Sequence, residues 1–364
     1  MTPHRHTDYD SIVHHFGPDP GTVGGMASVI RVLTEHSVGG EFVASHPTWS
    51  PQSQLHTVRL LTAATRMLLR IPPMHIAHVH LSERGSFLRE GALLALARHR
   101  GLVTVATIHG ASFSAFAHQH PRLISAVLTR ADLVTCLDNH VLEVVRHSAP
   151  AVQSELVANP VVIESDVPPA DETDELVVFA GEICLRKGAD VLARAWPSVA
   201  QRRPTARCLM VGPLADFKPA PTDRLDVGSP VGPAEMSRML RAARVIALPS
   251  RAEAMPMILA EAMSMGRPFV GTPVGAIPDL AAAGGMLVPV DDAEALADRL
   301  TDLLSNPDRA KRLGERGRRF CLETRSIGVI DARLRDLYKA AVASRSRRIA
   351  ARRFRPASPL RRNE

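Results

Sequence analysis

Short apolar segments rich in β-branched residues alternate with helical patterns along the second half of the chain, and this alternation limits the fold most. Segments 176–181, 206–211 and 245–248 are each followed by a turn or loop and then by a helical pattern. Such alternation is typical of βαβ units, in which helices cover a parallel sheet. The other elements expected here are strands at 268–272 and 286–290, helices at 187–200, 236–242, 257–265 and from 291 or 292 to about 304, and a helix opened by Pro307. A doubly wound α/β domain is predicted.

The first half has the same character but is less regular. The elements expected are strands at 11–16, 75–80, 102–109 and 133–137, a helix from Gly24 and Gly25 to about residue 34, and helices at 87–98 and 141–147. A polar, proline-rich segment at 157–174 suits a linker. With 364 residues, the chain can bury two cores. We predict one doubly wound domain at 1–165, a second at 166–344 and a disordered basic tail at 345–364. Ligands are expected in the cleft between the lobes, at the carboxyl ends of the strands.

The net charge of +7 is confined to that tail, which holds eight arginines and a single acid, Glu364. The rest of the chain is neutral, so no nucleic-acid partner is predicted, although the tail could touch an anionic membrane. No apolar run reaches the roughly 20 residues of a membrane span, and the first ten residues lack the apolar core of a signal peptide, so a cytoplasmic location is expected. The four cysteines are scattered without C-x2-C pairing, as expected for ordinary buried thiols.

Two glutamates, Glu253 and Glu261, frame the most informative motif. The strand at 245–248 leads into a loop and then a helix, because Pro256 suits the first helical position and Gly266 suits a left-handed residue after the last turn. Glu253 then lies in the loop and Glu261 in the second helical turn. Because a helix start offers unpaired N–H groups and a partial positive charge, this turn suits a phosphate. Helix capping and a solvated helical charge are the alternative roles.

Lys187 follows the strand at 176–181 and is expected to open the next helix. A positive charge there is unfavourable for the helix dipole unless it neutralises a bound phosphate. Only four of the 44 basic side chains are lysines, which adds weight to this position. Lys187 is therefore predicted to bind a diphosphate, with Arg186 as a helper, and a plain surface lysine is the alternative.

The first lobe offers a glycine turn and two groups of histidines. Gly24 and Gly25 follow the first strand, where paired glycines let backbone N–H groups approach a phosphate, although a plain turn has the same appearance. The chain has neither G-x-G-x-x-G nor G-x4-G-K-[ST]. His78 and His80 share a strand face without an acid or cysteine at ligand spacing, so no metal site is predicted. His109 ends a strand and is expected to face the cleft, whereas His80 suits a structural role equally well.

Together these motifs resemble the retaining glycosyltransferases of the GT-B fold, specifically family 4, also called glycosyl transferases group 1. The resemblance covers the chain except for its first ten residues and its tail. The residues that carry it are Gly24 and Gly25, His80 with Ser86 and Arg89, His109 and Gly110, Asn159 and Pro160, and segments 181–188, 228–235, 249–266 and 271–278. The fold implied is two doubly wound Rossmann-like α/β lobes facing a cleft. The resemblance implies that domain 1–165 is the acceptor-side Rossmann-like domain and that domain 166–344 is the nucleotide-sugar-binding Rossmann-like domain.

The resemblance also implies a nucleotide-sugar donor, bound as a substrate and without a cofactor. Glu253 would hold the transferring sugar, Glu261 the ribose hydroxyls and Lys187 the diphosphate, while His109 would contact the sugar from the first lobe. The implied catalytic residues are thus Glu253, His109 and Lys187, and the implied donor-binding residues are Gly24, Gly25, Arg186, Val231, Ala254, Met255, Pro256, Met257 and Glu261. In this family cationic and N–H groups take the place of a metal, because they stabilise the charge that gathers on the departing diphosphate.

One position departs from the family pattern, and one segment bears on the acceptor. Many relatives carry an arginine where this chain has Glu182, so either Arg186 supplies that charge or donor binding is altered. Segment 57–71 has apolar residues at helical spacing interleaved with Arg59, Arg66 and Arg70. Such a helix can lie on an anionic membrane or can face the core with a solvated basic side.

These features favour a metal-independent, retaining, hexosyltransferase-like enzyme of the cytoplasm or the inner membrane face, of the kind used in polysaccharide biosynthesis. It would transfer a sugar to a glycan, a glycolipid or another lipid-linked acceptor, or a small molecule. Two alternatives share the architecture: a non-hydrolysing sugar-nucleotide epimerase, and a catalytically degenerate nucleotide-sugar-binding scaffold, for which Glu182 is the main support.

Overall fold

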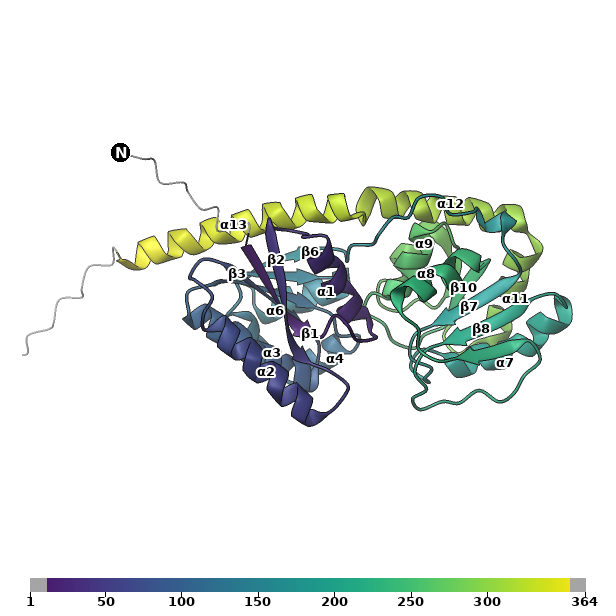
Figure 1. The fold of residues 1–364 in the computed structure, drawn as a ribbon, viewed down its shortest axis with the longest axis horizontal. Coiled ribbons are helices and arrows are strands. Elements are labelled where there is room, and N and C mark those ends of the chain that lie inside the picture. The colour runs from purple at the N-terminus through teal and green to yellow at the C-terminus, as the bar shows by residue number, and fades with distance from the viewer. Residues whose placement is uncertain (1–11, 354–364) are drawn as a thin grey trace, which may run out of the picture.

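The computed structural model describes residues 12–353 and places them in two α/β lobes (Figure 1). The first lobe contains a sheet of six parallel strands in the order β2-β1-β3-β4-β5-β6. Its strands are β1 (Ile12–Pro18), β2 (Phe42–Trp49), β3 (Ile76–Leu81), β4 (Val103–Ile108), β5 (Leu133–Cys136) and β6 (Gln153–Leu156). Its helices are α1 (Gly25–Glu35), α2 (Gln54–Leu68), α3 (Arg84–His99), α4 (Phe113–Gln119), α5 (Pro121–Leu128) and α6 (Asn139–Ser148).

The second lobe repeats this architecture with a six-stranded parallel sheet in the order β12-β11-β10-β7-β8-β9. Its strands are β7 (Leu176–Ala180), β8 (Arg207–Val211), β9 (Leu225–Gly228), β10 (Val245–Leu248), β11 (Phe269–Gly271) and β12 (Gly285–Leu287). Its helices are α7 (Ala189–Arg202), α8 (Pro233–Ala242), α9 (Met257–Ser264), α10 (Ile277–Gly284), α11 (Ala293–Ser305) and α12 (Pro307–Thr324). The prediction of two doubly wound parallel lobes is confirmed.

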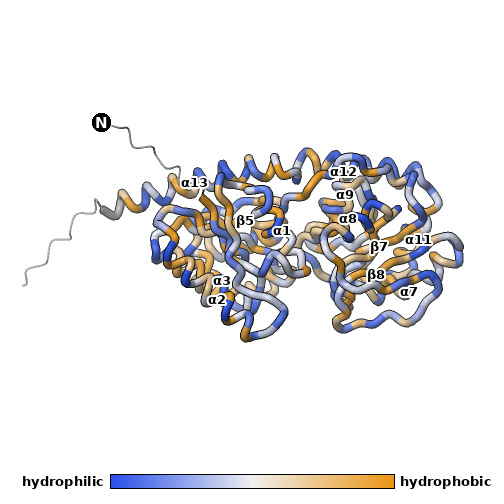
Figure 2. The backbone as a smooth tube through the Cα atoms, viewed as in Figure 1, coloured by the Kyte–Doolittle hydropathy of each residue, from blue (hydrophilic) through white to orange (hydrophobic). Residues whose placement is uncertain are grey.

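The central strands of each sheet supply most of the core. In β3, β4, β5 and β10 every residue is buried, as expected for strands covered by helices on both faces. Figure 2 shows these interior strands in hydrophobic colours, with hydrophilic segments mainly along the outer turns and helices. All four cysteines are buried free thiols, as predicted. No described helix combines the length and the apolar character needed to span a membrane.

The C-terminal helix α13 (Ile327–Arg353) leaves the second lobe and runs along the first (Figure 1). Its buried side chains form one stripe with helical spacing: Ile330, Leu334, Leu337, Tyr338 and Ala341. The Asp331 carboxylate accepts a hydrogen bond from the Gly39 N–H at 2.7 Å, and Arg345 donates to the Arg98 carbonyl at 3.0 Å. Helix α13 thus fastens the two lobes together.

The position of α13 disagrees with two boundaries predicted from the sequence, the end of the second domain and the start of the disordered tail. The interval 166–344 assigns residues 327–344 to the second domain, but they pack on the first lobe. The disordered tail expected from residue 345 is wrong over 345–353, which continue α13, because Arg345 is held by Arg98 and Arg348 pairs with the buried carboxylate of Asp132. Residues 354–364 of the predicted tail lie outside the described residues, as do residues 1–11.

Candidate functional site

The loop after β10, residues 249–256, is shaped by contacts with the chain after β11. The N–H of Ala276 donates to the Ala254 carbonyl at 2.8 Å, and the Thr272 hydroxyl donates to the Ser250 carbonyl. Gly275 has a φ of 53°, and a Cβ there would overlap the carbonyl oxygens of Glu253 and Ala254. Glycine at 275 therefore allows the loop to lie directly on the neighbouring backbone, which fixes the direction of Glu253.

Glu253 is the centre of a nearly buried group of polar side chains. Its Oε1 accepts hydrogen bonds from Lys187 Nζ at 2.7 Å and from the Ser250 hydroxyl at 3.0 Å. The exposed fractions of the Glu253 and Lys187 side chains are only 8% and 15%, so water weakens their attraction less than at an open surface. Arg186 Nη1 lies 3.9 Å from the same oxygen. The structure thus brings together three of the predicted site residues.

Lys187 does not open the following helix, as the sequence suggested. It lies in a turn that ends at Gly188, and α7 begins at Ala189. Gly188 adopts a left-handed φ of 69°, and a Cβ there would overlap the carbonyl oxygen of Pro249. This close approach brings the turn carrying Lys187 beside the loop carrying Glu253.

Glu182, the departure from the family pattern, forms a half-exposed ion pair with Arg186, with 3.4 Å between Oε2 and Nη2. Arg186 also donates from Nη1 to the Ala252 carbonyl at 3.2 Å. Glu182 therefore offsets part of the Arg186 charge, while Arg186 stays in contact with the Glu253 loop.

Glu261 lies on α9, as predicted, and contacts the other lobe. Its Oε1 accepts a hydrogen bond from the Ser28 hydroxyl of α1 at 3.2 Å, and Arg31 donates to the same hydroxyl at 3.1 Å. Burial raises the pKa of Glu261, while the hydrogen bond from Ser28 and the charge of Arg31 act in the opposite direction. A Cβ added to Gly25 would meet Met257 Cγ at 3.9 Å. The glycine turn at the start of α1 thus faces the start of α9 across the cleft.

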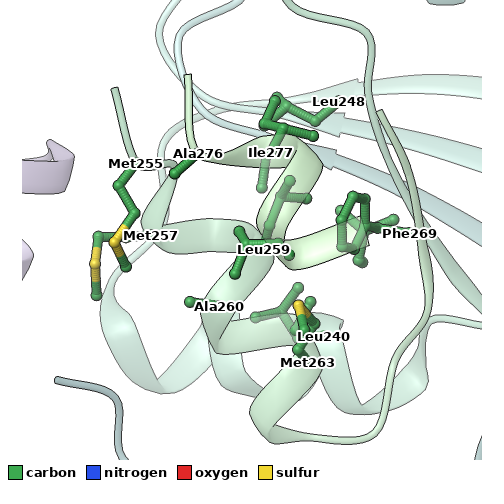
Figure 3. Packing of buried hydrophobic residues seen from close by; sticks show 14 of the residues in the cluster. Leu240, Leu248, Met255, Met257, Leu259, Ala260, Met263, Phe269, Ala276 and Ile277 are labelled. Atoms are coloured by element: carbon green, nitrogen blue, oxygen red, sulfur yellow. The ribbon is translucent and has the colours of Figure 1, made fainter. Parts of the chain in front are cut away.

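The start of α9 rests on an apolar base. Figure 3 shows Leu259 and Ala260 of α9 among the packed buried residues, with Met255 and Met257 at the margin of the group. Helix α9 begins at Met257, as predicted, but Pro256 is its N-cap and not its first helical residue. Gly266 adopts the expected left-handed conformation after the helix, with a φ of 69°. This packing holds residues 254–257 at the carboxyl edge of the sheet.

The remaining predicted residues lie at the same edges without joining the Glu253 group. His109 follows β4 and interacts through Nε2 with Nδ1 of His80 at 2.9 Å. Gly24 is the N-cap of α1, with a φ of 155°. Val231 lies in the loop between β9 and α8, and no described side chain of the Glu253 group forms a hydrogen bond with it.

Sequence reasoning missed several residues that the structure places at the site. Ser250 and Ser28 hold the two glutamates, and single serines in loops and helices carry no distinctive pattern. Arg325, a buried residue between α12 and α13, donates to Met255 Sδ at 3.1 Å. His15 could have been found from the sequence as a neighbour of the His78 and His80 pair. It lies on a predicted strand, and the register of the adjacent parallel strands β1 and β3 places it opposite His78.

Two α/β lobes, each built on a six-stranded parallel sheet, with the start of α1 facing α9, define the GT-B fold class. The resemblance seen in the sequence is confirmed by the family Glycosyl transferases group 1, whose model matches residues 174–306. The matched residues lie in the second lobe.

Curated relatives align mainly with about half of the chain. The D-inositol 3-phosphate glycosyltransferase of Segniliparus rotundus is 30% identical over 190 residues, 47% of this chain and 41% of the relative. The protein of the same name from Streptomyces coelicolor is 32% identical over 193 residues, 47% of this chain and 42% of the relative. The alignments thus span less than half the length of these curated relatives.

Solved structures match nearly the whole chain. Sucrose-phosphate synthase from Thermosynechococcus elongatus superposes with a TM-score of 0.72 at 20% identity, covering 92% of this chain and all of that one. HepE from Anabaena, in complex with UDP-glucose, superposes with a TM-score of 0.68 at 14% identity, covering 90% of this chain and 100% of that one. At these identities the likeness establishes the two-lobed fold.

Proposed function

We propose that the protein is a retaining, metal-independent glycosyltransferase that transfers a sugar from a nucleotide-sugar donor to a glycan, lipid-linked or small acceptor. The observation that carries this proposal is the Lys187–Glu253 pair, held at 2.7 Å beside the start of α9. A cation and a carboxylate at one sheet edge suit two adjacent parts of a nucleotide sugar, because the diphosphate is anionic and the sugar attached to it offers hydroxyl donors.

In the proposed reaction the bond between the sugar and the diphosphate breaks, and negative charge gathers on the diphosphate. Lys187 would shift toward the diphosphate, with Arg186 adding a second positive charge. Glu253 would accept hydrogen bonds from the sugar, oriented by Ser250, and Glu261 would accept them from the ribose. Groups that are already in place before the charge develops stabilise a transition state efficiently, because they need little reorganisation.

Donor chemistry is proposed from the relatives as well as from the site. HepE was solved with UDP-glucose, and the pneumococcal O-GlcNAc transferase GtfA with UDP and GlcNAc. UDP-linked hexoses are therefore the first donors to examine. His109 is proposed to contact the sugar from the first lobe, since it ends β4 at the edge that faces the cleft.

We also propose that the acceptor side meets an anionic membrane through α2. Several apolar side chains of α2 and its C-terminal end are exposed: Leu55, Val58, Met67 and Leu69. Arg59, Arg66 and Arg70 are exposed on the same segment. A groove of about 520 Å³ between α2 and α3, lined by leucines that include Leu61 and Leu88, gives this surface further apolar area. Exposed apolar and basic side chains together suit binding at a lipid interface.

The test of the proposed function is turnover of a panel of nucleotide sugars, measured as released nucleoside diphosphate. Lys187→Ala is expected to reduce turnover about 100-fold or more, the typical effect of removing one preorganised donor to developing charge. Lys339→Ala, which removes an exposed lysine from α13, is the matched control and is expected to retain activity. A chelator should leave turnover unchanged.

The same assay separates the alternatives. NMR of the products distinguishes transfer from epimerisation, because only transfer releases the nucleoside diphosphate while forming a new glycosidic bond. If calorimetry shows donor binding but no acceptor supports turnover, the enzyme hypothesis is rejected and the hypothesis of a nucleotide-sugar-binding scaffold is favoured. If the protein neither binds nor turns over any donor, the nucleotide-sugar site itself is rejected.

A further inference from the structure

Three histidines of the first lobe form a continuous chain of ring-to-ring contacts that ends at His109. His15 Nδ1 lies 2.9 Å from His80 Nε2, and His80 Nδ1 lies 2.9 Å from His109 Nε2. His15 and His80 are at most 1% exposed, whereas His109 is partly exposed at the carboxyl end of β4. The chain therefore runs from the interior of the sheet to its carboxyl edge.

The far end of this chain determines where the protons lie. A neutral imidazole carries one N–H and one bare nitrogen, so each contact in the chain needs a donor on one side and an acceptor on the other. His15 Nε2 is buried and has no hydrogen-bond partner among the described residues. A buried N–H without an acceptor is rarer in proteins than an under-used acceptor, so the proton of His15 belongs on Nδ1.

The consequence passes along the chain. His15 Nδ1–H donates to His80 Nε2, so His80 carries its proton on Nδ1 and donates it to His109 Nε2. His109 then has Nε2 as an acceptor and its own proton on Nδ1. The reverse order would leave an N–H of His15 buried without a partner.

The surroundings keep the rings neutral and in place. Burial lowers the pKa of His15 and of His109 to about 3 and lowers the pKa of His80 well below its usual range. His78 stacks on His80 with ring centroids 4.7 Å apart, and its own nitrogens contact the hydroxyls of Tyr338 and Thr107, both at 2.6 Å. Because hydroxyls can donate or accept, this branch fixes ring positions but not proton positions.

We propose that His15 and His80 are positioning residues that hold His109 in the tautomer with its proton on Nδ1. The first lobe then offers the cleft an N–H donor, suited to an oxygen acceptor on the ligand. That His109 meets a sugar rests on the proposed function, whereas the tautomer follows from the chain of histidines alone.

The same cluster invites a second interpretation. One nitrogen each from His15, His78 and His80 lies within 4.8 Å of the others, a spacing that a metal ion could bridge. In this structure every nitrogen of the three except His15 Nε2 is used in a hydrogen bond, and His15 and His80 contact each other directly. A tautomer chain explains these contacts without breaking any of them.

The experiment is long-range ¹H–¹⁵N NMR of the uniformly ¹⁵N-labelled full chain, with the His109 signals assigned by loss in His109→Gln. It distinguishes the protonated from the bare ring nitrogen, so no substrate is needed. We expect His109 to carry its proton on Nδ1. In His15→Phe the first donor is lost, and we expect mixed His109 tautomers, whereas His15→Asn keeps an amide donor near the place of Nδ1 and should retain the single tautomer.

His14→Phe is the matched control, because His14 is the neighbouring residue on β1 and contacts His46 and His75 instead of the chain. A proton on Nε2 of His109 in the wild-type protein would overturn the proposal, as would a single Nδ1–H tautomer that persists in His15→Phe. Added Zn²⁺ that shifts the His15, His78 and His80 signals together at stoichiometric amounts would overturn it in favour of a metal site. If His15→Phe does not fold, the wild-type spectrum still decides. If the protein turns over no donor but His109 keeps the Nδ1–H tautomer, the proposed function is refuted and the proposal for the three histidines stands.

Discussion

Lys187 and Glu253 neutralise each other in this structure, and that pairing has a consequence for the proposed chemistry. At 2.7 Å and with little exposure, the attraction between the carboxylate and the ammonium offsets part of the cost of removing both charges from water. In the proposed reaction an arriving diphosphate would compete with Glu253 for Lys187, and Glu253 would then be free to accept hydrogen bonds from the sugar. Donor binding and orientation of Glu253 would therefore be coupled through one ammonium group.

The backbone at Gly275 offers a test of how the Glu253 loop is positioned. Gly275→Ala should be destabilising by more than the roughly 1–2 kcal/mol of a left-handed non-glycine residue, because the new Cβ would also overlap two carbonyl oxygens of the loop. We expect a lower melting temperature and weaker donor binding in calorimetry. Gly328→Ala is the control, since nothing lies within 4 Å of a Cβ there. Unchanged donor affinity in Gly275→Ala would mean that this contact does not position Glu253.

At the scale of elements, the sequence left two interpretations of α2 open: a helix that lies on a membrane, and a helix that faces the core with a solvated basic side. Ala64 and Leu68 are buried against the lobe, while other apolar side chains and the arginines remain exposed. We expect the protein to sediment with vesicles containing anionic lipid and not with neutral vesicles. Arg66→Gln combined with Arg70→Gln should weaken this binding by about 2 kcal/mol, near 1 kcal/mol for each basic residue.

The comparison for this surface is a double variant of the second lobe, Arg202→Gln with Arg207→Gln, which removes the same charge from exposed positions. Equal loss of vesicle binding in both double variants would show that overall charge, and not α2, controls the interaction. Binding to neutral vesicles would also contradict the prediction.

Sequence patterns located the central strands and one edge strand, β12, but missed the other three edges for a physical reason. The three strands that were not predicted, β2, β6 and β9, each lie at an edge of a sheet. An edge strand is partly exposed and tolerates polar residues and proline, such as Pro47 in β2 and Asp226 in β9, so it lacks the apolar run of a buried strand. Helix α13 was also missed, although Ile330, Leu334 and Leu337 show its spacing.

The residues of the candidate site also differ in whether a local sequence pattern indicates them. Glu253, Glu261, Lys187 and Gly25 were found because a strand, a turn and a helix start frame them in the sequence. Ser28 and Ser250 were not, because their roles depend on which segments meet in space. The contact between Ser28 and Glu261 joins residues 233 positions apart, and no local pattern encodes it.

At the scale of the whole molecule, two of the contacts between the described parts of the lobes differ in strength. Helix α13 buries Tyr338 completely in the first lobe, while Ser28 and Glu261 form a single hydrogen bond across the cleft. Relative motion of the lobes would therefore break the cleft contact before the helix contact. This order suits a site that must open for a ligand while the two lobes stay connected.

Stability as a function of pH tests the buried histidines together. In the folded protein the pKa of seven histidines is lowered, chiefly by burial: His14, His15, His46, His75, His78, His80 and His109. The unfolded chain binds their protons below about pH 6.5, whereas the folded chain binds them only at lower pH. The free energy of unfolding must therefore decrease as the pH falls below about 6.5.

Each strongly shifted histidine contributes a slope that approaches roughly 1.4 kcal/mol per pH unit. Glu90 and Glu261 act in the opposite direction, because burial raises their pKa, but they are fewer. Urea unfolding at about pH 7 and about pH 5 should show a loss of several kcal/mol at the lower pH. His15→Phe should lose less stability between the two values than the wild type, while the exposed His118→Gln should match the wild type. Equal stability at both pH values would show that these imidazoles accept protons in the folded state, and neutral buried rings would then be excluded.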